Sequence, residues 1–393
     1  MHIHSMKTIY SYLLATVFLF MLSFNMIYSY GFEYFLTIKE NLTYNKSDLK
    51  YCSGEELNFP ADDILCLKPF EYIKDFKNPC WIGEDRLHCL PYFMLIGMDK
   101  CGTTDLFDRL TKHPAILGNN QDKETAWWSW SRYGLWLIRE IGKVSFQTYL
   151  DYFNESTITM NNTIDSQGYH PLITGDGTPM DMWDFRGWPQ IPQNVNKSEP
   201  VVLTPHLIHH LYPEMKFIII LRNPVERLYS DYFFIGLGKP SSFDFDLALN
   251  SSLDILNNCT NTFILRKCLY DKSLHQLWNY RARLHLGFYS VYLKEWFSVF
   301  PRRQFFILRT EDYSRNTLEH MKKLFEFLGV DTLNVTQMHS YGILFKDHKY
   351  KTEFKEQAGP MSNVSRELLT ELYKPYNIEL MNLLNDKRFL WET

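Results

Sequence analysis

The sequence has little excess charge of either sign. Its 393 residues include 41 lysines and arginines against 45 aspartates and glutamates, which gives a formal net charge of −4. A general nucleic-acid binder has a strongly basic balance, so this class is excluded and any recognition of anions must be local. Internal repeats and low-complexity tracts are also absent, and a hydrophobic content of 45% is ample for a large globular core.

Charged residues are missing from Thr8 to Phe32, where the chain is mostly Leu, Phe, Met, Tyr and Ile. This stretch is long enough to cross a bilayer, which takes about 20 residues, and it is long for the apolar part of a cleaved signal peptide. Lys7 before it and Glu33 after it favour a cytosolic N-terminus. We therefore expect a single-pass type II protein, with a cytosolic tail over residues 1–8, a transmembrane signal anchor over 9–32, a lumenal stem over 33–78 and a catalytic domain over 79–393.

Two independent features agree with a lumenal body. Nine sequons for N-glycosylation begin at Asn41, Asn45, Asn154, Asn161, Asn196, Asn250, Asn258, Asn334 and Asn363. Cysteine is scarce, but six of the seven form an even set available for disulfides in an oxidising compartment: Cys52, Cys66, Cys80, Cys89, Cys259 and Cys268. Cys259 and Cys268 are close enough to bridge one loop, whereas the pairing of the first four stays open. A zinc site is the weaker alternative, because no Cys-x-x-Cys pair occurs in the sequence.

Two short segments share one pattern, in which an apolar run leads into a polar loop and then an amphipathic stretch. The first runs from Tyr92 to Ile96 and continues into Lys100-Cys101-Gly102-Thr103-Thr104; the second runs from Lys216 to Leu221 and continues into Arg222–Ser230. Such a pattern is typical of a buried parallel strand that leads to a helix N-terminus, where free N–H groups and the helix dipole favour anions. A ligand with two separate anionic groups would suit the pair. Cys101 lies inside the first loop and is expected to be unpaired.

The alternation of strands and helices extends along the chain and predicts a single α/β domain. The run of Lys216–Leu221, which is apolar after its first residue, favours a central place in a parallel sheet. At the helix that follows, Asn223 suits the N-cap, Pro224 suits the first helical position, and Glu226 is expected to close a capping box. Further strands are expected at Val201–Leu203 and Gln304–Leu308, and helices at Thr103–Leu110, His206–Tyr212 and Asn316–Leu328.

The first loop does not fit the phosphate-binding loop of ordinary NTPases. That motif places its lysine directly after the second glycine, whereas here Lys100 comes before Gly102. A strand, a glycine and a helix in succession are common in α/β proteins and are usually structural. The combination with the second loop is what favours a nucleotide site.

These residues carry a resemblance to membrane-bound carbohydrate sulfotransferases, which use 3′-phosphoadenosine 5′-phosphosulfate (PAPS), and within them to the N-acetylgalactosamine 4-sulfate 6-O-sulfotransferase group. The resemblance covers residues 78–393. It rests on these segments: Pro79-Cys80-Trp81, Cys89-Leu90-Pro91-Tyr92-Phe93, Lys100–Leu106, Leu221–Tyr232, Gly287–Leu293, Leu308–Tyr313 and Tyr373–Asn377. It implies a P-loop-like sulfotransferase fold, with a central and mostly parallel sheet flanked by helices and preceded by one transmembrane helix.

The resemblance also implies roles for individual residues. Lys100, Cys101, Gly102, Thr103 and Thr104 would hold the 5′-phosphosulfate of PAPS, with Lys100 countering charge on the leaving phosphate. Arg222 and Ser230 would bind the 3′-phosphate, and the arginine fork matches phosphate oxygens. No metal is required, because side chains and backbone amides meet the charge of the leaving group.

A base is still needed for the acceptor hydroxyl. Lys123-Glu124 occupies the place of the Lys-Glu pair that supplies the base in related glycan sulfotransferases, so Glu124 is the candidate. The sequence departs from the family at Ala126, where relatives often carry His. The tryptophans that follow could equally line a sugar site or pack in the core: Trp127, Trp128 and Trp130.

Other groups of polar residues have plainer explanations. Asp244-Phe245-Asp246 resembles the metal-binding Asp-x-Asp of glycosyltransferases, but a capped first helical turn is the favoured interpretation. For His206, His209 and His210, a surface or partly packed cluster is favoured over a metal site, because no acidic or Cys partner adjoins them. Three aspartates are candidates for the acceptor cleft, with a turn as the alternative: Asp176, Asp181 and Asp184. Lys349 and Lys351 could reach the nucleotide, although solvated lysines are the simpler explanation.

Three functions follow from these patterns. The first is a Golgi membrane glycoprotein that transfers sulfate from PAPS to a glycan, with a glycosaminoglycan acceptor and 6-O-sulfation of N-acetylgalactosamine (4-sulfate) in chondroitin or dermatan sulfate as the expected position. The second is a metal-dependent Golgi glycosyltransferase. The third is an inactive sulfotransferase-like protein that binds glycan. A homo-oligomer stays open, and nucleic acid is not an expected partner.

Overall fold

A computed structural model describes residues 63–121, 123–137, 139–236, 238–344 and 353–391. The expected cytosolic tail, signal anchor and most of the stem lie outside these ranges, as do Cys52, Lys349 and Lys351. None of the helices within the described ranges combines the length and apolar character needed to cross a bilayer.

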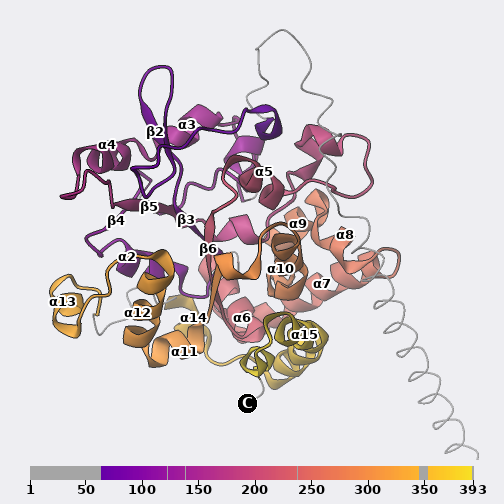
Figure 1. Cartoon of the computed structure of the whole chain (residues 1–393). Coiled ribbons are helices and arrows are strands. Elements are labelled where there is room, and N and C mark those ends of the chain that lie inside the picture. The colour runs from indigo at the N-terminus through magenta and orange to yellow at the C-terminus, as the bar shows by residue number, and fades with distance from the viewer. Residues whose placement is uncertain (1–62, 122, 138, 237, 345–352, 392–393) are drawn as a thin grey trace, which may run out of the picture. The chain divides into compact units, whose positions relative to one another are not determined.

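A five-stranded parallel sheet forms the centre of the described chain (Figure 1). Its strands lie in the order β4-β5-β3-β6-β7, and every neighbouring pair runs parallel. Their bounds are β4 Ile116–Leu117, β5 Ile173–Asp176, β3 Phe93–Gly97, β6 Lys216–Leu221 and β7 Phe305–Arg309. β3 is buried along its whole length and β6 along all but its first residue, as expected for interior strands covered on both faces. The predicted parallel sheet is therefore confirmed, and β6 has the predicted bounds.

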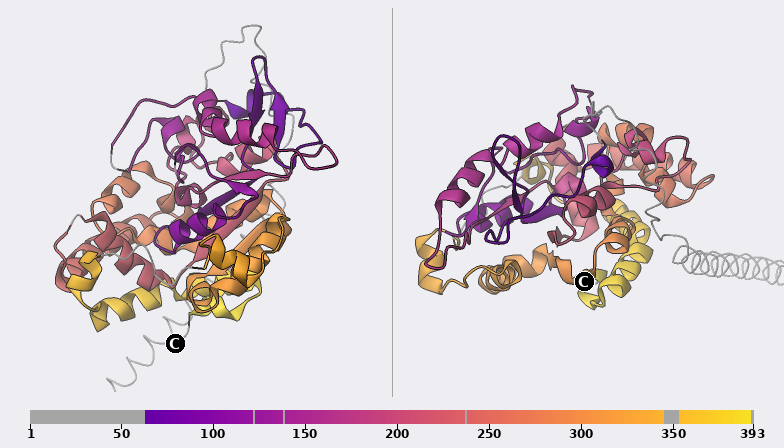
Figure 2. Two further views of the ribbon diagram at one scale, coloured as in Figure 1. Left: turned by 90° about the vertical axis from the view of Figure 1, so that its left-hand side faces the viewer. Right: turned by 45° about the horizontal axis from the view of Figure 1, so that its top comes forward.

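Helices flank this sheet (Figure 2). One group comprises α2, α11 and α12, in which the Tyr313 hydroxyl of α11 donates to Asp105 Oδ2 of α2 at 2.8 Å. Another group comprises α6, α10 and α15 (Figure 1). The helices are α2 Thr103–Leu110, α3 Phe146–Asp151, α4 Asn154–Asn162, α5 Thr204–Leu211, α6 Pro224–Ile235, α7 Ser242–Thr260, α8 Leu265–Leu269, α9 Lys272–Asn279, α10 Tyr289–Val299, α11 Thr310–Arg315, α12 Thr317–Leu328, α13 Val335–Ser340, α14 Glu353–Ala358 and α15 Asn363–Leu384.

Two local predictions were wrong. Val201 and Val202 form a bend and Leu203 caps α5, so no strand forms at 201–203. The backbone N–H groups of Val201 and Val202 donate to the Asn194 side chain instead of to a neighbouring strand. The capping box at α6 does not form either. Asn223 caps the helix by accepting from the Val225 N–H, but Glu226 pairs with Arg366 at 2.7 Å, while the Asn223 N–H donates to Glu311. Glu226 therefore pairs with a distant residue, and the Asn223 N–H uses a distant acceptor, in place of the local contact between them.

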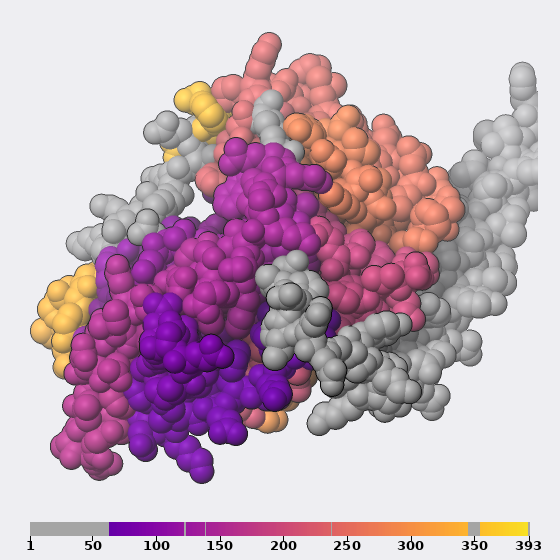
Figure 3. Space-filling model, turned by 90° about the horizontal axis from the view of Figure 1, so that it is seen from above, coloured from indigo at the N-terminus to yellow at the C-terminus, as the bar shows by residue number. Residues whose placement is uncertain are grey.

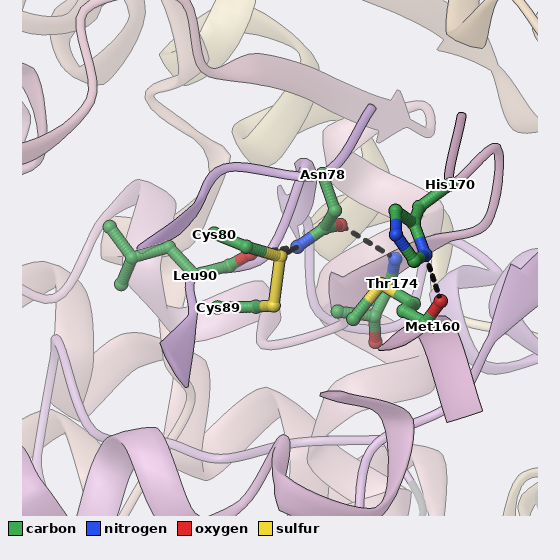
Figure 4. Close-up of a disulfide and its surroundings, with 7 residues drawn as sticks. All are labelled: Asn78, Cys80, Cys89, Leu90, Met160, His170 and Thr174. Carbon is green, nitrogen blue, oxygen red and sulfur yellow. Dashed lines mark hydrogen bonds between the residues drawn. A yellow bond between two sulfur atoms is a disulfide. The ribbon is translucent and has the colours of Figure 1, made fainter. Parts of the chain in front are cut away.

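Within the described ranges, two disulfides close short segments of the chain. Cys80 and Cys89 join β1 (Cys80–Ile82) to β2 (Leu87–Cys89), which pair antiparallel. The buried Asn78 side chain next to this disulfide donates to the Leu90 carbonyl at 2.6 Å and accepts from the Thr174 N–H at 3.0 Å (Figure 4). This contact ties the small ladder to β5. The early residues of the described chain, coloured indigo, form part of the face drawn in Figure 3. The second disulfide joins Cys259 to Cys268, as predicted, and Cys101 is free and buried.

Candidate functional site

The loop between β3 and α2 presents the N-terminus of α2 at the carboxyl end of β3, the central strand of the sheet. Lys100 and Gly102 both have left-handed backbone conformations, with φ of +62° and +99°. Gly102 is the N-cap of α2, and a residue without a Cβ adopts this conformation without strain. No side chain caps the first turn of α2, so its N–H groups point toward any anion placed there. Thr103 and Thr104 add their hydroxyls at the same end of the helix.

Several contacts hold this loop against the end of β6. The Thr310 hydroxyl donates to the Cys101 carbonyl at 2.6 Å and lies 3.1 Å from the Leu221 carbonyl. The Arg222 guanidinium donates to the Lys100 carbonyl at 3.4 Å. The structure thus brings the two predicted anion loops side by side, as expected for the carboxyl ends of adjacent parallel strands.

The Lys100 side chain reaches toward α6. Its ammonium lies 3.7 Å from the centre of the Phe234 ring, a cation–π contact with a side chain that is 61% exposed. Burial lowers the pKa of Lys100, although the carboxylates of Asp231 and Asp99 oppose that shift. Phe234 lies four residues after Ser230 on α6, so both are on one face of the helix. The Lys100 side chain therefore lies against the face of α6 that carries Ser230.

The second loop is fixed by its own backbone contacts. The Tyr289 hydroxyl donates to the Arg222 carbonyl at 2.8 Å, and Asn223 caps α6. The Arg222 side chain remains half-buried, while Ser230 is buried on the second turn of α6. These contacts fix the backbone of Arg222, from which its guanidinium side chain extends.

Lys355 is a further cation at this site that sequence reasoning missed. It comes from α14, which packs on α6, and its ammonium lies 3.5 Å from Glu226. Burial, with help from the charge of Arg222, lowers the pKa of Lys355. The signal available in the sequence was the lysine-rich stretch before Gly359, but the interpretation there concerned Lys349 and Lys351.

The candidate base lies next to the first loop. The Lys123 ammonium donates to Thr103 Oγ1 at 3.2 Å and to Glu124 Oε1 at 2.6 Å. Lys123 is buried, whereas the Glu124 side chain is 40% exposed and can meet a substrate. The backbone is fixed here by the Gly177 N–H, which donates to the Lys123 carbonyl at 3.0 Å. One lysine thus connects the expected base to the expected phosphosulfate loop.

The segment after Glu124 is core. Its three tryptophans are 1%, 2% and 6% exposed, so they pack in the interior: Trp127, Trp128 and Trp130. Ala126 is also buried, has a φ of +49°, and donates its N–H to the Thr178 hydroxyl at 3.1 Å. This buried segment therefore holds the loop of Glu124 in the core.

The three aspartates proposed for an acceptor cleft are interior groups. Asp176, Asp181 and Asp184 are at most 1% exposed. Asp176 accepts from the hydroxyls of Thr125 and Thr178 at 2.6 and 2.7 Å, and burial raises the pKa of Asp176 to about 6. Burial and the charge of Asp176 raise the pKa of Asp181. Their burial contradicts the cleft interpretation, whereas Asp181 lies in a short 3-10 turn (Pro179–Met182), in agreement with the alternative.

The two aspartates of the glycosyltransferase-like Asp-x-Asp make hydrogen bonds near the ends of helices. Asp244 lies in the first turn of α7, where it accepts from the Tyr232 hydroxyl at 3.1 Å and the Lys239 N–H at 2.8 Å. Asp246 accepts from Ser362 and Ser365 at the start of α15. The favoured interpretation, a capped first turn, is confirmed, with Ser241 as the cap.

The three histidines of the 206–210 segment are spread over α5. His206 accepts from the Leu203 N–H, His210 donates to the Leu67 carbonyl at 2.7 Å, and His209 packs on Phe300. Within the described ranges, no group of three or more His, Cys, Asp or Glu side chains is arranged to hold a metal ion.

Known proteins resemble this chain over most of its described length. The sulfotransferase domain family matches residues 90–363. Carbohydrate sulfotransferase 15 of Mus musculus is 35% identical over 318 residues, which are 78% of this chain and 56% of that protein. The Homo sapiens protein of the same name is 34% identical over the same shares. The chain spans about half the length of the curated relatives it matches. A solved sulfotransferase from Alicyclobacillus acidocaldarius aligns with a TM-score of 0.43 at 20% identity, covering 76% of this chain and 96% of that one.

Proposed function

Because the chain belongs to the sulfotransferase domain family, we propose that it transfers a sulfuryl group from PAPS to a hydroxyl group of a glycan. The observation that carries the proposal is the path from Glu124 through Lys123 to Thr103, which puts a partly exposed carboxylate beside an anion-binding loop. The second loop, with Arg222 and Ser230, lies against the first and supplies a second place for a phosphate.

In this mechanism each loop binds one phosphate-bearing end of the nucleotide. The N–H groups at the start of α2, the threonine hydroxyls and Lys100 hold the 5′-phosphosulfate, while Arg222 and Ser230 hold the 3′-phosphate. Lys355 is close enough to Arg222 to add positive charge there. The residues present fit a nucleotide with phosphate at both ends.

The transfer step is an in-line displacement at sulfur. Glu124 takes the proton of the acceptor hydroxyl as the new bond forms between that oxygen and sulfur. The bond from sulfur to the 5′-phosphate oxygen breaks, and its electron pair stays on the phosphate. Lys100 and the α2 N–H groups stabilise that negative charge, and adenosine 3′,5′-bisphosphate leaves.

The similarity to carbohydrate sulfotransferase 15 favours a glycosaminoglycan acceptor. The proposed position is the 6-hydroxyl of N-acetylgalactosamine 4-sulfate in chondroitin or dermatan sulfate. We place the protein in the Golgi membrane, anchored by residues 9–32, with a stem over 33–78 and the catalytic domain, residues 79–393, in the lumen. The sequons and the disulfides support this compartment.

The test is sulfate transfer by the purified full chain. Radiolabelled PAPS and EDTA would be supplied with a panel of desulfated and partly sulfated glycosaminoglycans, and product disaccharides would be identified. Label on the 6-position of N-acetylgalactosamine 4-sulfate is the expected result. Label on another position would correct the acceptor alone. Binding of nucleotide without transfer to any acceptor would favour the glycan-binding alternative, and no binding of nucleotide would overturn the proposal.

Replacing Arg222 by Ala is expected to weaken nucleotide binding. A charge-assisted bond to phosphate is worth about 1.5–3 kcal/mol, so the KM for PAPS should rise roughly tenfold to a hundredfold. Initial rates at varied PAPS would measure it. The control is Arg303→Ala, an exposed arginine before β7, which should leave the KM unchanged. An unchanged KM in Arg222→Ala would remove this residue from the 3′-phosphate site.

A further inference from the structure

Four charged side chains are buried beneath the two nucleotide loops. They are two arginines and two aspartates. Asp99 precedes the first loop and is the least buried of the four, Arg227 and Asp231 lie on α6, and Arg283 precedes α10. Arg227 and Asp231 are 0% exposed and Arg283 is 3% exposed, while the Asp99 side chain is 14% exposed. Buried charges are costly unless they are paired, so the contacts among these four decide how the loops are held.

Arg283 contacts both aspartates with one guanidinium. Its Nε donates to Asp231 Oδ2 at 2.9 Å, and its Nη2 donates to the other oxygen of the same carboxylate. The same Nη2 lies 3.7 Å from Asp99 Oδ1. Asp99 directly precedes Lys100, and Asp231 directly follows Ser230. One side chain therefore connects the neighbour of the expected 5′-phosphosulfate residue to the neighbour of the expected 3′-phosphate residue.

Further contacts surround this bridge. Arg227 lies 3.3 Å from Asp231 and donates to the Arg283 carbonyl at 2.9 Å, so it fixes both the partner and the backbone of Arg283. Trp183 Nε1 donates to the second oxygen of Asp99 at 2.7 Å. Although burial alone would raise it, the pKa of Asp231 lies below its ordinary value because Arg283 and Arg227 stabilise the carboxylate.

The segment that carries Arg283 makes a second connection between the loops. Arg283 is the N-cap of η7 (Leu284–Gly287), and Tyr289 begins α10 after one intervening residue. The Tyr289 hydroxyl donates to the Arg222 carbonyl at 2.8 Å and lies 4.0 Å from Cys101 Sγ. Residues 283–289 thus contact both loops at two separate points.

We propose that Arg283 is a positioning residue that fixes the distance between the two phosphate-binding loops. The inference rests on the proposed function, because it concerns how that nucleotide is bound. A ligand with a phosphate at each end gains affinity when both ends bind at once, and this gain depends on the separation of the two sites. Lysine cannot replace the planar fork of arginine here, since it cannot reach two carboxylates in fixed geometry.

The experiment compares three nucleotides on the full chain by calorimetry. Adenosine 3′,5′-bisphosphate uses both loops, whereas adenosine 3′-monophosphate and adenosine 5′-monophosphate each use one. In Arg283→Lys the bisphosphate should bind about tenfold more weakly, while each monophosphate changes by less than about threefold. A role in overall stability alone would move all three affinities together, along with the thermal midpoint.

Two further variants protect the test against misfolding. Asp99→Asn keeps an acceptor for Trp183 but removes the charge, and we expect a smaller loss with the same selectivity for the bisphosphate. Glu295→Gln alters another arginine pair, with Arg266 at 2.6 Å, and should leave all three affinities unchanged. Equal losses for all three nucleotides in Arg283→Lys, or no loss, would overturn the inference alone. A wild-type protein that fails to bind the bisphosphate would overturn the proposed function as well.

Discussion

Replacing Lys100 by Ala should reduce kcat by about 10²- to 10³-fold, the usual cost of removing one group that stabilises a developing negative charge. In the proposed mechanism the Lys100 ammonium is the side-chain cation that the β3–α2 loop offers to the breaking bond, and it lies on the face of α6 that carries Ser230. Its contact with the Phe234 ring is weaker than an ion pair with phosphate, so a bound nucleotide would draw the ammonium from the ring. Single-turnover rates at saturating PAPS would measure the effect.

Lys112→Ala is the matched control, because Lys112 lies at the other end of α2 and pairs with Asp108 at 2.9 Å. It should retain wild-type kcat. Binding of adenosine 3′,5′-bisphosphate to Lys100→Ala separates the two contributions of the lysine. If Lys100→Ala binds adenosine 3′,5′-bisphosphate almost as tightly as wild type but loses most of its kcat, the lysine acts mainly by stabilising the transition state. A kcat within a few fold of wild type would remove Lys100 from the leaving-group role.

The regular elements around the site could be predicted because their signals are local. β6 is apolar after its first residue, and α2 follows a glycine with its apolar residues on one face. Both therefore have the predicted bounds. Parallel strands place their carboxyl ends at one edge of the sheet, which is why two loops more than a hundred residues apart could be expected to meet. The order of strands along the sheet could not be predicted, since it depends on crossovers.

What the sequence did not reveal was the buried support of the site. Glu226 at the third position of α6 looks like half of a capping box, yet its carboxylate pairs with Arg366 and Lys355 from the C-terminal part of the chain. Asp99, Asp231 and Arg283 each look like ordinary surface charges until the fold buries them together. Pairing over such distances has no periodicity that a single sequence displays.

Glu124 is a second case in which the sequence alone could not identify the function of a residue. A Lys-Glu dipeptide is in most proteins a solvated pair, and only the family resemblance suggested a base. The structure adds an asymmetry that the sequence lacked: Lys123 is buried and bonded to Thr103, while the Glu124 carboxylate is partly exposed. A base must be reachable by the acceptor and held in a fixed place, and this pair meets both requirements.

Glu124→Gln is therefore expected to lower kcat by about 10²- to 10⁴-fold, the range typical of removing a general base. Glutamine keeps the size of the side chain and can still accept from Lys123, so the first loop should stay in place and the KM for PAPS should change little. Initial rates at varied PAPS and saturating acceptor would measure both constants. Glu124→Ala should show the same loss of kcat.

Glu155→Gln, at an exposed position in the first turn of α4, provides the matched control and should leave both constants unchanged. A parallel rise in the KM for PAPS in Glu124→Gln would mean that the carboxylate acts by holding Lys123, and thereby Thr103, rather than by accepting a proton. Lys123→Met separates these roles further, because it removes the link to Thr103 while leaving the carboxylate. If Glu124 is the base, Lys123→Met should raise the KM more than Glu124→Gln does, and Glu124→Gln should lower kcat more. Wild-type kcat in Glu124→Gln would exclude the residue as the base.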